Sequence, residues 1–389
     1  MKYQNSIFRQ LLEFIPRDKF QEMVDRHHGD KGTHKLSCWT QFIALSYSQI
    51  RAMDSIRTIE NGLNVHRNHW YHLDISGIKR STFSDANNKR PCQIYEDLFE
   101  YLLGKCQHYS RSHFEFNNPI RSMDATTIEL CQGLFPWAKF GQSKGGIKVH
   151  VQLEHNSYLP DMVVITDQKD HEVKVFQGLT FKPDSIYVVD RGYLDFEVLH
   201  RIHTSKAYFV IRAKKDMNYS VVGQQDSDHP QVISDEEIQV PWLHRIQPSK
   251  RPKYPDILRL VTYEDPETGK VYRFLTNIEK FRPETIALIY KQRWQIELFF
   301  KWIKQHLKIK AFIGNSRNAV MTQIWVAMIV YLIFWYFKHQ TKFKGTLFHL
   351  ASIINEILFS RVHLLDILGF DNPEPPSLQD SGQLLLWCT

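Results

Sequence analysis

A single carboxylate lies within a row of cations between residues 283 and 310. On a helix that advances about 100° per residue, one face carries Tyr290, Arg293, Glu297, Lys304 and Lys308. Guanidinium and ammonium groups hold phosphates, and a carboxylate beside them is suited to a metal ion. The same spacing also permits a simple ion pair between Arg293 and Glu297 on a solvated face. Both interpretations stand on this stretch alone.

Two more carboxylates lie at positions where a sheet could bring them to Glu297. Asp124 is in the middle of an alternating stretch, residues 120–130, that predicts a strand. Asp190 ends a short apolar run, residues 185–190, that predicts a buried parallel strand. Taken singly, Asp124 could be a polar strand residue and Asp190 a turn residue. On neighbouring strands of a mixed sheet, beneath the 283–310 helix, all three carboxylates would converge.

Three converging carboxylates predict a metal site. The cluster is electrostatically unfavourable unless a cation neutralises it. Hard oxygen ligands select Mg²⁺ or Mn²⁺ over zinc. Two such ions about 3.5–4 Å apart can activate a water or a 3′-hydroxyl and stabilise the leaving oxygen. This is the chemistry of phosphodiester cleavage and transfer.

The elements that must position these residues follow from the apolar periodicity. We expect an α/β fold: three antiparallel strands, a strand–helix–strand unit, an all-β insertion and then a long helix. The predicted strands are 120–130, 148–154, 160–166, 185–190 and 207–212, then 237–242 and 256–263 in an insertion at about 213–270, and 272–277. The long helix begins at Pro283, which suits a first helical turn, and no Gly or Pro follows until Gly314.

The sequence predicts three domains with boundaries at about residues 113 and 335. Residues 1–113 have helical spacing, residues 114–335 hold the sheet, and residues 336–389 form a helical tail. In the first domain a helix closed by Gly62 and a short helix from Ser81 could form a helix-turn-helix DNA reader. An ordinary helical bundle is the alternative.

Composition favours a polyanionic partner and a reducing compartment. The formal charge is +7, and residues 282–317 alone hold eight Lys or Arg against two Glu. Clustered cations among Tyr, Trp and Phe are typical of nucleic-acid binding. None of the five cysteines forms a CxxC pair, so neither zinc nor a disulfide framework is indicated.

Localisation in the cytoplasm is expected, with no membrane partner. The first residues lack the apolar core of a signal peptide. Residues 324–337 are uncharged and apolar, but a span needs about 20 residues. We therefore predict a buried helix there.

The motifs carrying these residues resemble those of IS4-type DDE transposases from bacterial insertion sequences. The most specific is Tyr290-x2-Arg293-x3-Glu297-x6-Lys304, the Y-R-E-K signature with its spacing intact. Residues 188–193, VVDRGY, resemble the block around the second aspartate, and residues 123–127, MDATT, resemble the first. The resemblance covers roughly residues 115–335, and the N-terminal helical part resembles the DNA-binding region of such enzymes more weakly.

The resemblance implies an RNase H-like mixed sheet flanked by helices, with a β-strand insertion between Asp190 and Glu297. It implies that Asp124, Asp190 and Glu297 are catalytic ligands of two Mg²⁺ ions, with Mn²⁺ as a substitute. It further implies a homodimer on terminal inverted repeats that cleaves DNA strands and joins them to target DNA. Bacterial, nucleoid-associated localisation follows. The residues assigned to DNA contact are Tyr290, Arg293, Lys304, Trp294 and Lys308, where Trp294 either stacks on DNA or packs in the core.

Two other functions remain open at this stage. A degenerate or repurposed copy would bind DNA at specific sequences without catalysis. A structure-directed nuclease on the same fold would cleave DNA without joining ends. Metal-dependent strand transfer distinguishes the transposase from both.

Overall fold

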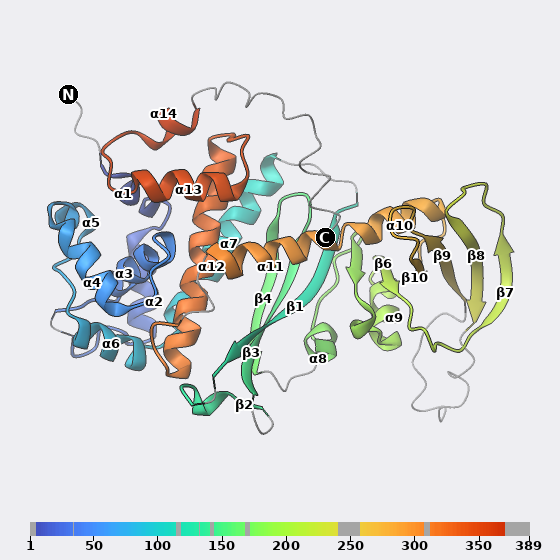
Figure 1. Cartoon of the computed structure of the whole chain (residues 1–389), viewed down its shortest axis with the longest axis horizontal. Helices are drawn as coiled ribbons and strands as arrows, with labels where there is room; N and C mark the ends of the chain where they lie inside the picture. Colours follow the sequence, from blue (N-terminus) through green and yellow to red (C-terminus); the bar gives the residue numbers. More distant parts are fainter. Residues whose placement is uncertain are drawn as a thin grey trace. The chain divides into compact units, whose positions relative to one another are not determined.

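The computed structural model describes residues 5–33, 35–113, 118–131, 133–140, 144–167, 172–239, 257–306 and 312–369. These residues form a mixed α/β chain (Figure 1). The chain divides into two compact units. The helical unit comprises Met1–Leu102, His306–Gly314 and Asn318–Thr389, and the sheet unit comprises Leu103–Gln305 and Asn315–Arg317.

Helices alone build the first unit within its described residues. They are α1 (Ile7–Leu12), α2 (Arg17–Arg26), α3 (Cys38–Ile50), α4 (Ile56–Val65), η1 (Arg67–His69), α5 (Trp70–Leu73), α6 (Arg80–Lys89), the start of α7 (Gln93–His113), nearly all of α12 (Arg317–Gln340), α13 (Leu347–Ile357) and α14 (Leu364–Gly369). Helices α3, α4 and α6 contact one another, and α13 packs on α3. Every residue of α3 is buried, so α3 forms the centre of this unit.

Helix α12 is the buried apolar helix that the sequence predicts, but it is longer than the 324–337 run. With 24 residues it is long and apolar enough to cross a membrane by length and composition alone, and 89% of its apolar window is buried in the structure. It groups with the helical unit, whereas the sequence places residues up to 335 with the sheet. Apolar periodicity shows that a helix is buried but not which neighbours bury it.

The expected helix-turn-helix differs from the structure in its connection. Helix α4 continues past Gly62 to Val65, and residues 66–79, including η1 and α5, separate it from α6. A tight helix-turn-helix has only a three- to four-residue turn. Gly62 is explained by packing, because a Cβ there would lie 2.5 Å from the Tyr47 hydroxyl oxygen.

The second unit is built around one 10-stranded sheet. Its strands are β1 (Ile120–Leu130), β2 (Lys139–Phe140), β3 (Lys144–Glu154), β4 (Leu159–Asp167), β5 (Ile186–Val189), β6 (Tyr208–Arg212), β7 (Ser220–Gln225), β8 (Val232–Gln239), β9 (Leu258–Glu264) and β10 (Val271–Thr276). Its other elements are the rest of α7, the helices η2 (Pro136–Ala138), α8 (Glu172–Gln177), η3 (Arg191–Tyr193), α9 (Phe196–Thr204), α10 (Pro283–Lys291) and α11 (Trp294–His306).

The strand order confirms the prediction that the strands carrying Asp124 and preceding Asp190, β1 and β5, are neighbours in a mixed sheet. It is β2-β3-β1-β5-β6-β10-β9-β8-β7, with β4 paired to β3. Strand β1 is antiparallel to β3 and parallel to β5, and β5 is parallel to β6. This is an RNase H-like arrangement. The strands of the insertion extend the same sheet through β10, and β2 and β7 are strands that the sequence did not predict.

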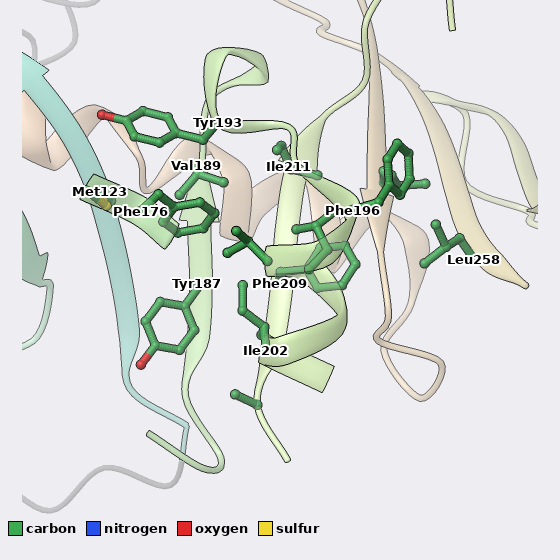
Figure 2. Close-up of a cluster of buried hydrophobic side chains, with 14 of the residues drawn as sticks. Met123, Phe176, Tyr187, Val189, Tyr193, Phe196, Ile202, Phe209, Ile211 and Leu258 are labelled. Carbon is green, nitrogen blue, oxygen red and sulfur yellow. The ribbon is translucent and has the colours of Figure 1, made fainter. Parts of the chain in front are cut away.

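The two faces of the sheet bury different neighbours. Figure 2 shows Met123 of β1 and Val189 of β5 in one apolar cluster with Phe176 of α8 and Ile202 of α9. On the other face Val188 packs with residues of α10. Because side chains alternate along a strand, Asp124, next to Met123, faces the α10 side.

The predicted single helix from 283 to 310 is interrupted, which corrects the sequence reading. Helix α10 ends at Lys291 and α11 begins at Trp294. At the break the backbone N–H of Arg293 donates to the Tyr290 carbonyl (2.9 Å), three residues back rather than four. Such a tighter turn inside a helix changes the direction of the side chains after it. Residues 307–311, at the end of the predicted helix, lie outside the described part of the chain.

Candidate active site

Asp124 is partly exposed at the centre of β1, on the face covered by α10. One carboxylate oxygen, Oδ1, accepts a hydrogen bond from the backbone N–H of Ala125 (2.8 Å). The other, Oδ2, lies 3.4 Å from Nη1 of Arg293. Strand β1 therefore holds the Asp124 carboxylate in contact with Arg293, which lies at the break between α10 and α11.

Asp190 follows the last residue of β5 and contacts α10 through Tyr290. The Tyr290 hydroxyl donates to Oδ1 of Asp190 (3.3 Å). The Tyr290 ring packs on Phe274 with centroids 4.7 Å apart. Burial raises the pKa of Tyr290 to about 12; Arg293 opposes this shift and Asp190 adds to it. The phenol is therefore protonated at neutral pH and acts as a donor to the carboxylate.

Arg293 bridges two of the three carboxylates. Its Nη2 pairs with Oε1 of Glu297 one turn along, and its Nη1 pairs with Asp124. Burial alone would lower the pKa of Arg293, but Tyr290, Glu297 and Asp124 outweigh burial and raise it. The guanidinium is a permanent positive charge between two acids, and the Arg293 side chain is only 19% exposed.

The structure thus brings together five of the eight site residues that the sequence predicted. These are Asp124, Asp190, Tyr290, Arg293 and Glu297. Trp294 begins α11 and is 43% exposed. Lys304 is partly buried on α11, seven residues beyond Glu297, which is about 10 Å along a helix. Lys308 lies outside the described residues.

The carboxylates have the chemistry of a divalent-cation site, but their partners are protein groups. Asp124, Asp190 and Glu297 are the hard oxygen donors that Mg²⁺ and Mn²⁺ prefer. Among the described residues, no three His, Cys, Asp or Glu side chains gather closely enough to hold a metal. Arg293 supplies the charge that neutralises Asp124 and Glu297. A metal would therefore compete with Arg293 for these two ligands.

Arg259 of β9 is a positioning residue that the sequence did not reveal. Its guanidinium makes two contacts with Asp235 of β8, at 2.8 and 2.7 Å, and both side chains are buried. The same guanidinium donates to the carbonyls of Ile278 (2.9 Å), Glu279 (3.1 Å) and Phe281 (2.7 Å). This segment leads directly into α10. The insertion therefore fixes the start of the helix that carries Tyr290.

The fold and the site together define a class of protein. Acids at the centre of β1, at the end of β5 and on α11, in contact with Arg293 or Tyr290, fit the class of phosphodiester-transfer enzymes that the sequence predicts. A family profile described as Transposase DDE domain matches residues 115–333. The chain belongs to this DDE transposase family.

Related proteins carry transposase names. The protein y4zB of Sinorhizobium fredii, named as a transposase, is 32% identical over 297 residues, 75% of this chain and 80% of its own. A Geobacillus stearothermophilus protein named for insertion sequence element IS5377 is 30% identical over 269 residues, 68% of this chain and 70% of its own. A Synechocystis protein named for insertion sequence element IS4SA is 26% identical over 266 residues, 65% of this chain and 70% of its own.

The chain also matches a second family profile and a solved structure. Residues 3–78 match a domain of unknown function (DUF4372). A solved piggyBac transposase synaptic complex with hairpin DNA aligns with a TM-score of 0.47 and 10% identity, over 97% of this chain and 84% of that one.

Proposed function

We propose that this chain binds the terminal inverted repeats of an insertion sequence and catalyses metal-dependent cleavage and transfer of DNA strands, as a cut-and-paste transposase. Membership of the DDE transposase family supports the reaction class. The observation that carries the proposal is that Arg293 contacts both Asp124 and Glu297, while Tyr290, three residues before Arg293, contacts Asp190. Acids from three elements are thus joined to two neighbouring residues, and two of these acids share one cation.

Asp124, Asp190 and Glu297 would hold the divalent ions, two Mg²⁺ with Mn²⁺ as a substitute. When bound, such ions supply an activated water or 3′-hydroxyl and stabilise the leaving oxygen. The protein holds these carboxylates on rigid elements: Asp124 inside a strand paired on both sides, Asp190 at a strand end, and Glu297 on α11. Rigid placement of ligands is what such chemistry needs.

Arg293, Tyr290, Lys304 and Lys308 are proposed to contact the terminal phosphates. Arg293 is a fork-shaped donor next to the carboxylates, and guanidinium groups bind phosphates in two-point contacts. A phosphate that draws Arg293 away would release Asp124 and Glu297 for metal. Trp294 is partly exposed at the start of α11 and is proposed to stack on a base of the DNA end.

The remaining assignments follow from the reaction. Residues 1–113 are proposed as the DNA-binding domain, residues 114–335 as the catalytic domain and residues 336–389 as a helical tail. Two copies would pair the two ends of one element, because both ends must be cut and joined together. The protein would act in the cytoplasm on the nucleoid.

The test is a cleavage and strand-transfer assay with the intact chain. Linear DNA carrying the sequence that flanks the gene is mixed with a supercoiled target plasmid and Mg²⁺, Mn²⁺ or Ca²⁺. We expect nicks at the element ends and end-to-target products with Mg²⁺ and Mn²⁺, and neither with Asp190→Asn. Binding without cleavage in every ion would favour a DNA-binding protein without catalysis, and cleavage without joining would favour a nuclease.

A further inference from the structure

Helix α6 presents a polar outer face for which the structure shows no internal use. Ser81, Asp85 and Asn88 follow one another at helical spacing along the exposed side, and Arg80 and Lys89 lie at the two ends. Within the described residues, none of these five side chains forms a hydrogen bond or an ion pair. The face carries two cations and one acid, and no apolar residue is exposed on this helix.

Helix α6 is held in place by polar contacts to its neighbours. Gln41 of α3 donates from Nε2 to Oδ1 of Asn87 (2.7 Å), and Oε1 of Gln41 accepts from Nη1 of Arg90 (3.1 Å). Asn318 of α12 donates to the carbonyls of Asn87 (2.9 Å) and Arg90 (2.5 Å). At the other end of α6, the backbone N–H of Arg80 donates to Oε1 of Glu60 in α4 (3.2 Å). The helix is therefore held from three sides, which leaves its outer face in a defined place.

The residue types on the outer face do not serve helix stability. Ser, Thr, Asp and Asn are weaker helix formers than the Glu, Lys, Gln or Ala that suit a merely solvated helix. Ser81, Thr82, Asp85 and Asn88 are all short, so another molecule can approach the helix backbone closely. Short hydrogen-bonding side chains suit contacts with base edges in a DNA groove, and the cations on either side of them suit contacts with the two phosphate backbones that border the groove.

We propose that the outer face of α6 enters the major groove of duplex DNA and reads base edges. Ser81, Asp85 and Asn88 contact the bases, and Arg80 and Lys89 contact phosphates on either side. Asn pairs with adenine, Asp accepts from the amino group of cytosine, and Ser bonds to several bases. Ten residues of helix span about 15 Å, which fits across a groove about 12 Å wide. The inference rests on the proposed function only in taking duplex DNA as the partner.

The experiment measures sequence preference with the full-length chain and no chemistry. Two labelled duplexes of equal length are used, one with the DNA end that flanks the gene and one with the same bases shuffled. Both are titrated in Ca²⁺ at several salt concentrations, and preference is the ratio of the two Kd values. The base-reading variant is Ser81→Ala with Asn88→Ala, and the phosphate variant is Arg80→Gln with Lys89→Gln. Ala is a better helix former than either residue it replaces, so the first variant keeps the helix.

We expect the base-reading variant to lose about tenfold or more of the preference, because two base contacts disappear, with little change for the shuffled duplex. The phosphate variant weakens both duplexes alike and lowers the slope of log Kd against log salt by about two. The matched control, Gln21→Ala with Asn68→Ala, removes exposed polar groups elsewhere in the helical unit and keeps the preference.

An unchanged preference in the base-reading variant would overturn the inference, as would a wild-type protein that binds both duplexes equally. Failure of the proposed function gives a different result. A wild-type chain that prefers the end duplex through α6 but never cleaves it would refute catalysis and keep α6 as the reader. Cleavage of the end duplex, together with a sequence preference that the base-reading variant leaves unchanged, would support catalysis and refute α6 as the reader.

Discussion

At the scale of residues, Arg293 decides the charge state of the site. It pairs with Glu297 and, across 169 residues of sequence, with Asp124. The sequence predicts the first pair from the i, i+4 spacing. It does not predict the second, because that contact depends on how α10 and α11 lie on the sheet. The acids were visible as residue types at two strand positions and one helix position, whereas the counter-ion shared by Asp124 and Glu297 was not.

Replacing Arg293 by Gln should strengthen binding of a divalent cation. Without the guanidinium, Asp124 and Glu297 repel each other, and a metal relieves that repulsion without displacing an ion pair. We expect Mn²⁺ affinity to rise severalfold in calorimetry of the DNA-free protein. Lys301→Gln on α11 removes an exposed cation and should leave the affinity unchanged. Weaker Mn²⁺ binding by Arg293→Gln would show that the guanidinium supports the site.

Replacing Lys304 by Ala should weaken binding of duplex DNA and lower its salt dependence. A cation that contacts a phosphate releases about one counterion. The slope of log Kd against log salt is expected to fall by about one in Lys304→Ala and again by about one when Arg293→Ala is added. Fluorescence anisotropy at four or more salt concentrations gives the slope. If the slope keeps its wild-type value, neither side chain contacts phosphate.

At the scale of elements, the break between α10 and α11 and the anchoring of α10 position the site. No Gly or Pro marks the break at residues 292–293, so the sequence predicts one continuous helix. The anchoring comes from the insertion, where Arg259 joins β8 to the segment before α10. Sequence periodicity placed β9 and β10 but missed β7, because its residues are mostly exposed on both faces and show no alternation.

Replacing Asp235 by Ala should destabilise the sheet unit strongly. The change leaves the Arg259 guanidinium buried without its carboxylate, which typically costs about 3–5 kcal/mol. Urea unfolding followed by circular dichroism should show this loss. Glu267→Ala breaks an exposed pair with Lys291 and should cost at most about 1 kcal/mol. Similar effects of the two substitutions would mean that the buried pair does not anchor α10.

At the scale of the whole molecule, sequence periodicity predicts the strands of the sheet more accurately than it predicts how the chain divides into two units. The strands β1, β3, β4, β5 and β6 have clear apolar patterns, and the predicted place of β1 beside β5 is confirmed. The grouping of α12 with the N-terminal helices was not predicted. Which elements pack together depends on contacts between residues far apart in the chain, such as Asn318 with Asn87, and those contacts leave no periodic signal.

The overall stability of the chain should depend on His155 below neutral pH. His155 is buried, its Nε2 lies 2.7 Å from the Ser122 hydroxyl oxygen, and burial lowers its pKa to about 4. The unfolded chain binds this proton at about pH 6.5. The stability that comes from keeping His155 neutral is therefore fully present above pH 6.5. The free energy of unfolding falls by about 3 kcal/mol between pH 6.5 and 4. His155→Gln removes this pH-dependent part of the stability, so the free energies of unfolding of wild type and variant, plotted against pH, should converge as pH falls. A constant difference between the two plots would contradict the assignment.

The proposed reaction requires that Glu297 completes a metal-dependent catalytic site with Asp124 and Asp190. The most direct measurement compares wild type and Glu297→Gln for nicking of the DNA end in Mg²⁺, with DNA affinity measured alongside. Glu284→Gln on α10 is the matched control. We predict that Glu297→Gln binds the DNA end with near wild-type affinity and loses nicking by a factor of about 10³ or more, as expected when a catalytic group is removed, while Glu284→Gln keeps both. Nicking by Glu297→Gln at the wild-type rate would show that Glu297 is not part of the catalytic site.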